Sequence, residues 1–587
     1  MLSYDELKGT ADQRWKDLTQ GDMPWVRVGT EMNGHAAGGF QVIDAIRSEL
    51  GARNIAAYVD EVGTLGLSYA EPILDVLKPG RRSRLLFREV AVDDLPEIID
   101  KYIVNDAIPG DKAFAYLGEE PIEGVPDLRS IPQYRMQQRI AMRNAGHIAP
   151  ADIYQYIAND GYAALNKALF EIGADTVIEE MKASNLRGRG GAGFPTGLKW
   201  SFMVNSPGPV KYIACNCEEG DPGAFNDKAI LESDPHTLLE GMLLAGFSTG
   251  ASNGFVFIRH GHDGPIDRTE RAIEQAYELG ILGKNIMGSD FSFDIEVSLT
   301  GDSYVAGEET ALMESIEGKR SMPRFKPPFP AAAGIWQKPT TINNVKTLAY
   351  APQIILNGSE WFSGIGTEKS TGTAIACLTG HITYPGIYEV PMGLTIGQVI
   401  NDVGGGVPSG KSLKLLQTGG PLGGVLGPDS LDVKIDFDDM AAAGAIFGSG
   451  GLIVGNEDTS VVDLIRVLVT FCQYESCGKC FPCRLGMTQL LDIMERIARF
   501  EGKPEDLDVC ERLGNTMQIG SLCAHGQLGF NPIKSALTHF ISEFEEHLNE
   551  RRDPTGRTST KFFSPKATRP YSEDFREVQP LEVIGSL

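Results

Sequence analysis

The sequence predicts a multidomain α/β protein whose last domain is helical. The chain has 587 residues, which is enough for roughly three to five domains of ordinary size. Strand-like apolar runs alternate with segments of helical periodicity through most of residues 1–345. Residues 460–550 show helical periodicity and contain a compact group of cysteines. We therefore expect α/β layers first and a helical bundle near the C-terminal end.

The composition argues against several classes of protein. Asp and Glu number 78 and Lys and Arg number 53, so the net charge is −25. Such an acidic surface disfavours nucleic acid or an anionic membrane as the main partner. There is no apolar run long enough for a transmembrane segment, and residues 1–8 lack a charged-then-apolar signal pattern. These features predict a cytoplasmic protein, compatible with docking on a membrane-bound complex.

The first part of the chain mixes helix-like and strand-like segments. Residues 40–50 have helical periodicity, whereas residues 54–59 and 83–87 are predicted strands. Residues 121–145 contain three prolines and are predicted to be a linker. No cysteine occurs before Cys215.

Residues 185–200 form the most informative stretch of the chain. Five glycines alternate there with Arg187, Arg189 and Lys199. Glycines let a backbone approach an anion and point its N–H groups at it, so the stretch predicts a phosphate cradle rather than a flexible loop. A Rossmann fingerprint should follow a strand, but residues 176–184 read as a helix. We therefore reject the ordinary Rossmann fingerprint and keep the cradle.

Several strands are predicted after the cradle. Residues 210–215, 254–259 and 291–299 read as strands, and residues 267–279 read as a helix. The first of these strands runs into the acidic segment 216–223. Acidic residues just past the carboxyl end of a strand are well placed for a ligand in an α/β crevice, but composition alone favours a solvated acidic turn.

A small β-rich domain is predicted between residues 370 and 435. Residues 383–391 contain Pro and Gly at positions typical of a hairpin turn, and residues 393–400 are predicted to be a helix. Nothing in this region suggests chemistry.

The C-terminal cysteines have the spacing of a metal site. Cys477, Cys480 and Cys483 form C-x₂-C-x₂-C, and Cys523 is a distant fourth thiol. This spacing favours a [4Fe–4S] cluster over structural zinc, which usually uses paired C-x₂-C knuckles. Cys472, Cys510 and His525 lack ligand spacing, so we predict core thiols and a structural histidine. The remaining tail has no periodicity and is predicted to wrap a partner or stay disordered.

Several of these motifs together resemble a known family. Residues 187–200, 304–310, 326–330, 340–345 and 475–484 resemble motifs of the NADH-oxidising flavoprotein subunits. This family includes a subunit of respiratory complex I and the diaphorase subunits of NAD-linked hydrogenases and formate dehydrogenases. The resemblance extends from about residue 145 to about residue 545, and it implies FMN, NAD(H) and a [4Fe–4S] cluster as cofactors.

The resemblance also implies which residues form the site. An FMN and NADH site is implied at Gly188, Arg189, Gly190, Gly191, Ala192, Gly193, Phe194, Lys199, Phe202, Asn216, Glu218, Glu219, Asp221, Tyr304, Gly307, Glu308, Glu309, Lys326, Phe329, Asn343 and Asn344. Glu309 and Asp221 are the residues closest to a catalytic role, because they would hold ribose or carboxamide groups. The phenylalanines would sandwich the rings, and the four thiols, Cys477, Cys480, Cys483 and Cys523, would ligate the cluster. Lys346 would add charge near a phosphate or simply face solvent.

The resemblance divides the chain into six segments. They are a thioredoxin-like ferredoxin domain without cluster ligands at 1–120, a linker at 121–145, a Rossmann-like FMN- and NADH-binding domain at 146–345, a β-grasp domain at 346–438, a helical [4Fe–4S] domain at 439–549 and a tail at 550–587. In the first domain Asn33, Thr64 and Ser68 stand where the family has cysteines, so the domain is predicted to be a docking or spacer module.

The function implied by the resemblance is NADH oxidation within a larger complex. Electrons would leave through the [4Fe–4S] cluster to a small thioredoxin-like [2Fe–2S] subunit and on to further iron–sulfur or catalytic subunits. The alternatives are reversed or bifurcating NAD⁺ reduction, and a relay or scaffold subunit without nucleotide turnover. The intact cradle with Glu308, Glu309 and Lys326 favours a subunit that turns over nucleotide.

Overall fold

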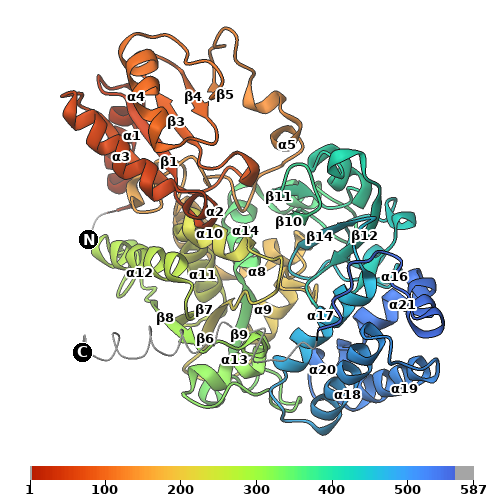
Figure 1. The fold of residues 1–587 in the computed structure, drawn as a ribbon. Helices are drawn as coiled ribbons and strands as arrows, with labels where there is room; N and C mark the ends of the chain where they lie inside the picture. Colours follow the sequence, from red (N-terminus) through yellow and green to blue (C-terminus); the bar gives the residue numbers. More distant parts are fainter. Residues whose placement is uncertain (1–2, 562–587) are drawn as a thin grey trace, which may run out of the picture.

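The computed structural model describes residues 3–561. Figure 1 shows an N-terminal α/β domain above a central α/β domain, with a β-rich domain and a helical domain beside the latter. Three sheets occur in the described chain, two of five strands and one of four. This architecture confirms the predicted multidomain α/β fold. Most of the predicted tail lies outside the described residues.

The N-terminal domain contains a βαβ unit followed by a hairpin. Its strands, in spatial order, are β2 (Tyr58–Val62), β1 (Trp25–Gly29), β3 (Leu74–Leu77), β4 (Ser83–Phe87) and β5 (Ala113–Gly118). β1 and β2 are parallel, the remaining pairs are antiparallel, and α3 (Gly39–Ala52) connects the parallel pair. This is the arrangement expected of a thioredoxin-like domain. The strand predicted at 54–59 is misplaced, because Asn54 has a left-handed backbone and pairing starts only at Tyr58.

Carboxyl groups occupy the region where the resemblance expects cluster ligands. Glu71 is buried and accepts the N–H of Ile73 at 2.8 Å, and burial raises its pKa to about 8. Thr64 accepts the N–H of Gly66 at 2.9 Å. The domain is also fixed to the central domain, since the N–H of Met32 donates to Glu232 at 2.6 Å. The N-terminal domain is therefore in direct contact with the central domain, and its role as a docking or spacer module stays a prediction.

The predicted linker is an irregular but anchored segment. It contains α5 (Pro132–Arg135), and the backbone N–H groups of Ile140, Ala141 and Met142 all donate to the buried carboxylate of Glu389, at 2.9 to 3.0 Å. Three such bonds to one carboxylate hold this segment against the β-rich domain. The segment is therefore a connection that is hydrogen-bonded to the β-rich domain and not a free linker.

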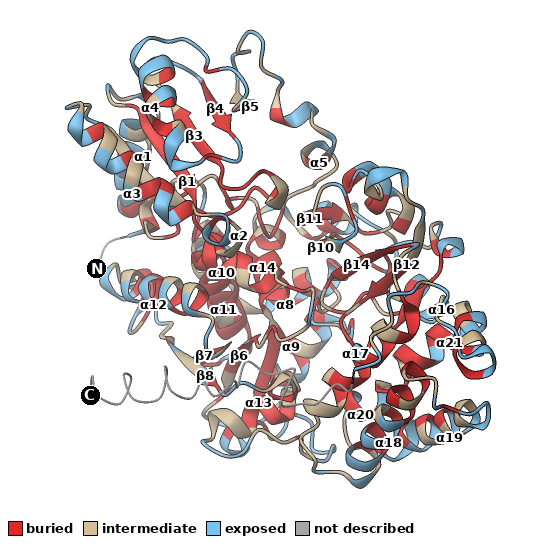
Figure 2. Ribbon diagram, in the orientation of Figure 1, coloured by how far each residue is buried: buried red, intermediate tan, exposed pale blue. Residues whose placement is uncertain are grey.

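The central domain has an all-parallel sheet covered by helices. Its strands, in spatial order, are β8 (Asp294–Thr300), β7 (Asn253–Arg259), β6 (Tyr212–Cys217) and β9 (Thr340–Asn344). The covering helices include α8 (Gly173–Ala183), α9 (Thr196–Val204), α11 (Pro235–Thr249), α12 (Asp263–Glu278) and α14 (Val345–Asn357). α11 is buried along nearly its whole length, whereas α12 has one exposed face (Figure 2). The domain is Rossmann-like, as predicted.

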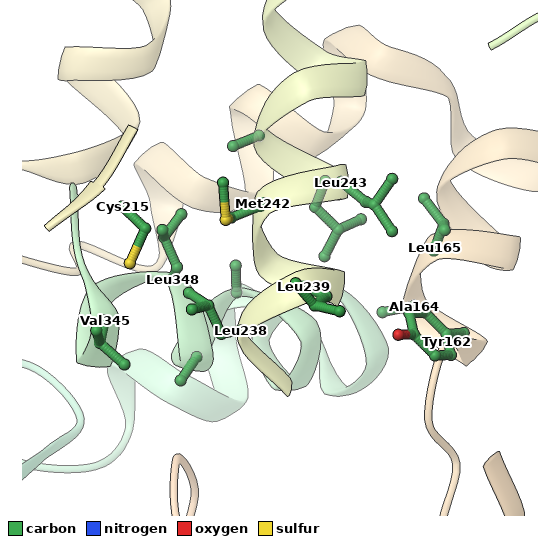
Figure 3. Close-up of a cluster of buried hydrophobic side chains, with 14 of the residues drawn as sticks. Tyr162, Ala164, Leu165, Cys215, Leu238, Leu239, Met242, Leu243, Val345 and Leu348 are labelled. Atoms are coloured by element: carbon green, nitrogen blue, oxygen red, sulfur yellow. The ribbon is translucent and has the colours of Figure 1, made fainter. Parts of the chain in front are cut away.

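The centre of this domain is an apolar layer between α11, α14 and β6. Figure 3 shows Leu238, Met242 and their neighbours on α11 facing Leu348 of α14 and Cys215 of β6. Cys215 is fully buried there, so it is a core thiol. Because α14 packs against α11, the domain continues beyond the boundary predicted at residue 345.

The β-rich domain also extends beyond its predicted boundary. Its strands, in spatial order, are β11 (Gly386–Pro391), β10 (Thr373–Gly380), β14 (Gly451–Asn456), β12 (Leu413–Thr418) and β13 (Val425–Leu426). β10 and β11 form the predicted hairpin. β14 pairs with both β10 and β12, so the domain ends near residue 456 and not at 438. The helix predicted at 393–400 begins only at Ile396 and continues as a π-helix over Gln398–Val403, because Gly393 takes a left-handed turn and Thr395 pairs with Lys434.

The last domain is helical, as predicted. It comprises α17 (Val461–Tyr474), α18 (Phe481–Ala498), α19 (Glu505–Gly520), α20 (Ala524–Leu528) and α21 (Asn531–Glu545). Val461, Val469, Met487, Leu490 and Ile533 form part of its apolar core. Within residues 3–561 no helix combines the length and apolarity that a bilayer crossing requires.

Candidate functional site

The glycine cradle is a loop between α8 and α9. Gly191 and Gly193 have φ values of +111° and +62°, which other residues rarely adopt. A Cβ on Gly190 would lie 3.1 Å from Cβ of Asn344, so the loop passes closely over the carboxyl end of β9. A Cβ on Gly197 would collide with the backbone of Lys182, which explains how closely α8 and α9 approach. A helix precedes the loop, which confirms the rejection of the ordinary Rossmann fingerprint.

The two arginines of the cradle hold the loop in place. Arg189 is buried, and its guanidinium donates to the carbonyls of Arg187, Thr371 and Thr373 at 2.5 to 3.1 Å. Arg187 pairs with Asp438 at 3.1 Å. This corrects the expectation that the Arg189 charge faces the cofactor, since its donors are used on carbonyls. Its backbone and the exposed Ala192 remain part of the cradle.

The polar ends of β6 and β9 lie side by side beneath the cradle. Asn216 is paired in register with Asn344, because the two strands are parallel neighbours. The amide of Asn216 donates to the carbonyl of Gly307 at 2.8 Å and accepts the N–H of Glu218 at 3.0 Å. Asn343 accepts the indole N–H of Trp200 at 3.0 Å. Tertiary structure thus brings four distant motifs to one sheet edge, the position where α/β folds bind ligands.

Two of the predicted cofactor carboxylates cap helices instead. Glu219 accepts the N–H groups of Asp227 and Lys228, both at 2.9 Å, at the start of α10 (Asn226–Ser233). Glu308 accepts the N–H groups of Thr310 and Ala311 at the start of α13 (Glu309–Ile316). Carboxylates are stabilising at helix N-termini, where backbone donors are unpaired. In this structure both carboxylates hold helix N-termini, and their contact with the cofactor stays a prediction.

Glu218 is a buried acid beside an arginine. Its carboxylate lies 2.9 Å from the guanidinium of Arg259. Burial nevertheless raises the pKa of Glu218 to about 8, because desolvation outweighs the attraction of Arg259. A Cβ on Gly307 would lie 3.1 Å from the Glu218 carboxylate, so a side chain at position 307 would crowd it.

Glu309 lies between two lysines at the edge of the site. Its carboxylate is 2.7 Å from the ammonium of Lys326 and 3.4 Å from that of Lys199. Burial opposes ionisation, but the two cations outweigh it and hold the pKa of Glu309 below its ordinary value. Lys199 also donates to the carbonyl of Ile342 at 2.6 Å. The resemblance assigned Glu309 and Lys326 to the nucleotide, and Lys199 was predicted in the phosphate cradle; in the structure the three charged groups form one network.

Several exposed aromatic side chains lie near these charged residues. Some flank Lys326 in the chain, and others lie at the cradle and on α9. Phe194 and Phe202 have ring centroids 6.3 Å apart, and both are about half exposed. Phe329 is 60% exposed and follows Lys326 closely in the chain. Phe325 is 73% exposed and was missed by the sequence analysis, although an aromatic beside Lys326 could have indicated it. Rings left open to solvent are available for stacking on a planar ligand.

Lys346 is buried rather than facing solvent. Its ammonium lies 2.9 Å from the carboxylate of Asp227 and 2.6 Å from the amide oxygen of Asn226. Asn344 caps α14 and donates to the same aspartate at 2.6 Å. The solvent-facing alternative for Lys346 is therefore wrong.

The four predicted cluster ligands line one hollow in the helical domain. Cys477, Cys480, Cys483 and Cys523 surround it together with Val305 and His525. Cys480 precedes α18 and Cys523 precedes α20, so helix N-termini position two of the thiols. Within residues 3–561 no three His, Cys, Asp or Glu side chains converge around the position of a single ion. Four thiols spread around a shared hollow fit a multi-iron cluster better than one zinc ion.

Cys472 and Cys510 are core thiols, as predicted, and the neighbouring His525 is held by a backbone contact. Cys472 and Cys510 are fully buried in the helical core. His525 is buried, and its Nε2 lies 2.8 Å from the carbonyl oxygen of Cys472. This bond ties α20 to α17.

A short turn connects the sheet edge with the thiol hollow. The turn consists of Tyr304–Gly307: the carbonyl of Gly307 accepts from Asn216, while Val305 lines the hollow. The ring of Tyr304 packs against those of Phe471 and His525, with centroids 5.3 and 5.8 Å apart. The turn therefore belongs to both the sheet edge and the lining of the thiol hollow.

The cradle, the open aromatic rings and the thiol hollow together define a class: a flavin- and iron–sulfur-dependent oxidoreductase subunit. Residues 181–353 match the Nuo51 FMN-binding domain, residues 375–426 the SLBB domain, and residues 463–547 the NADH-ubiquinone oxidoreductase-F iron-sulfur binding region. The chain belongs to the family of NADH-quinone oxidoreductase F subunits. The FMN-binding domain and the [4Fe–4S] region predicted from the sequence are thereby confirmed.

Two relatives and one solved structure illustrate the similarity. The NADP-reducing hydrogenase subunit HndC of Solidesulfovibrio fructosivorans is 47% identical over 72% of this chain and 85% of its own length. The NADH-quinone oxidoreductase F 2 subunit of Rhizobium meliloti is 43% identical over 71% of this chain and all of its own length. The fold resembles a chain of an NAD⁺-reducing [NiFe]-hydrogenase in the H2-reduced state, with a TM-score of 0.62 at 25% identity, covering 93% of this chain and 88% of that one.

Proposed function

We propose that this chain is the subunit of a multi-subunit redox complex at which NADH is oxidised or, in the reverse direction, NAD⁺ is reduced. The observation that carries the proposal is the Tyr304–Gly307 turn, which contacts the predicted flavin site on one side and the thiol hollow on the other. When bound, FMN supplies the exchange of a hydride for single electrons. The turn places residues that would hold FMN next to residues that would hold the cluster.

The cradle supports FMN as the cofactor. Gly190 brings the backbone close to Asn344 at the end of β9, and Gly191, with a left-handed φ, brings it close to Gly448. Backbone N–H groups at such a loop suit a phosphate, and α9 begins directly after it. Asn216 and Asn344 would add amide groups beside the cofactor. Arg189 and Glu219 would hold the surrounding backbone rather than touch the cofactor.

The charged network and the open rings support a dinucleotide. Phe194, Phe202 and Phe329 would stack on its rings, because each presents an exposed aromatic face. Lys326 and Lys199 would orient the Glu309 carboxylate toward ribose hydroxyls. No side chain has to transfer a proton in this arrangement, so these residues bind and orient the nucleotide.

The surface beside the thiol hollow supports a separate iron–sulfur partner. Phe481, next to Cys480, is 65% exposed, and Ile519 is 87% exposed. The two lie near each other, because a Cβ on Gly520 would be 3.0 Å from the ring of Pro482. With Leu485 they form an apolar surface, here named the 481–519 surface. The N-terminal domain has no cysteine of its own, so we propose a small thioredoxin-like [2Fe–2S] subunit as the partner at this surface.

The function is tested by anaerobic titration of the purified full chain with NADH. We expect NADH to bleach the flavin absorbance and to support reduction of an artificial dye. If excess NADH leaves the flavin oxidised while dithionite reduces it, the chain is a relay subunit and the proposal is wrong. NADPH in a parallel titration identifies which dinucleotide is preferred.

A further inference from the structure

Two loops of the β-rich domain reach the predicted nucleotide site. One loop contains Gly419 and Gly420, and the other, residues 447–451, leads into β14. A Cβ on Gly191 of the cradle would lie 3.7 Å from Cα of Gly448. A Cβ on Gly448 would in turn lie 2.6 Å from Cα of Gly419, so the two loops are in contact. The sequence suggested no chemistry for this domain, yet it closes one side of the cradle.

Asp221 is the residue on which these loops converge. The hydroxyl of Ser449 donates to Oδ2 of Asp221 at 2.5 Å, across a separation of 228 residues. A Cβ on Gly420 would lie 2.5 Å from Oδ1 of Asp221, so a side chain at position 420 would displace the carboxylate. Oδ1 is buried and has no hydrogen-bond partner among the described residues.

A buried carboxylate oxygen without a donor is costly, because desolvation is not compensated. The cost is removed when a ligand supplies a hydroxyl or amide N–H, as the ribose and carboxamide groups of a dinucleotide can. The Tyr304 hydroxyl is the other polar group beside Asp221. Burial raises the pKa of Asp221, whereas the Ser449 and Tyr304 hydroxyls lower it and so favour the ionised carboxylate. Lys346 and Asp227 are paired with each other, and Lys346 also donates to the carbonyl of Ser449 at 3.3 Å.

We propose that Ser449 is a positioning residue of the nucleotide site, which fixes Asp221 so that its free oxygen accepts a hydrogen bond from the dinucleotide. This inference rests on the proposed function. It makes the site an interface between two domains: the central domain supplies Asp221, and the β-rich domain supplies the donor that orients it. The same loop also accepts a hydrogen bond from the central domain: the side-chain amide of Asn226 donates to the carbonyl of Ser449 at 2.7 Å.

The test is a set of variants of the full chain assayed for NADH-dependent dye reduction. Ser449→Ala removes the donor, and Ser449→Thr keeps a hydroxyl. Ser412→Ala is the matched control, since this serine donates to the carboxylate of Glu457 at 2.5 Å near the opposite end of β14. We expect Ser449→Ala to raise the KM for NADH roughly ten-fold, the range for a hydrogen bond to a charged group, with flavin content, iron content and kcat nearly unchanged. Ser449→Thr should recover most of the affinity, and Ser412→Ala should have no effect.

A double-mutant cycle separates positioning from a merely structural role. If Ser449 acts through Asp221, Ser449→Ala adds nothing to the KM of Asp221→Ala. An unchanged KM in Ser449→Ala, or fully additive effects in the double variant, would overturn the inference. Loss of flavin in Ser449→Ala alone would also overturn it, because the residue would then stabilise the cradle. Failure of the wild-type chain to reduce dye would instead reject the proposed function itself.

Discussion

The backbone N–H of Tyr304 donates to the carboxylate of Glu475 at 3.0 Å, although 171 residues separate them in the chain. Tyr304 begins the turn at the predicted flavin site, and Glu475 lies two residues before the first cluster ligand. The bond therefore fixes the helical domain against the central domain at the point where electrons would cross. Electron transfer between cofactors depends on such fixed separations, and the predictions below test the parts on either side.

The cradle is tested by Gly191→Val. Gly191 has φ of +111°, so a branched side chain strains the loop and projects over the surface proposed for FMN. We expect the purified variant to lose flavin absorbance and to keep its iron. Gly250→Val is the matched control: Gly250 has φ of +74° with open space around it, at the other end of the sheet. Equal flavin content in the two variants would contradict the assignment of the cradle.

The thiol hollow is tested by Cys480→Ser. One [4Fe–4S] cluster predicts about four irons per chain, and loss of a ligand should lower this content sharply while flavin stays bound. Cys472→Ser is the control, since Cys472 is buried in the core outside the hollow. A [2Fe–2S] signal in the electron paramagnetic resonance spectrum of the isolated chain would contradict the prediction of a single cubane cluster.

Glu218 predicts a pH dependence of stability. Its pKa is raised to about 8 by burial, against an ordinary value of 4.5. A raised folded-state pKa gives an acid a stabilising contribution that is complete below the ordinary value and is lost as pH rises through the folded value. Relative to Glu218→Gln, the wild-type protein should therefore lose unfolding free energy between about pH 5 and pH 8. Thermal unfolding of both proteins across this range measures the difference, and parallel pH profiles would show that Glu218 ionises normally.

The 481–519 surface is tested by Ile519→Asp. A charge on an apolar contact surface should weaken association with the iron–sulfur partner by roughly ten-fold or more, the cost typical of a disrupted interface anchor. NADH-dependent dye reduction should persist, because the surface lies outside the nucleotide site. Phe170→Asp is the control, as Phe170 is 54% exposed on the central domain. Co-purification of the partner with Ile519→Asp at wild-type yield would contradict this docking surface.

Features confined to one short stretch could be read from the sequence alone. The glycine cradle, the C-x₂-C-x₂-C spacing and the helical C-terminal domain are of this kind, because a loop, a motif and a periodicity depend on neighbouring residues. The rejection of a Rossmann fingerprint was correct for the same reason, since the residues before the cradle have helical periodicity. The core position of Cys472 likewise followed from its lack of ligand spacing.

What each polar side chain contacts was decided only by the tertiary structure. Arg189 and Glu219 are residue types that often bind cofactors. Arg189, however, donates to the carbonyls of Thr371 and Thr373, before and in β10, and Glu219 caps α10. β14 joined the β-rich domain because it pairs with β10, which lies far earlier in the chain. Ser449 reaches Asp221 only because two domains pack together. A sequence shows which donors and acceptors exist, but long-range packing determines which of them meet, because hydrogen bonds form only where burial brings the groups within reach.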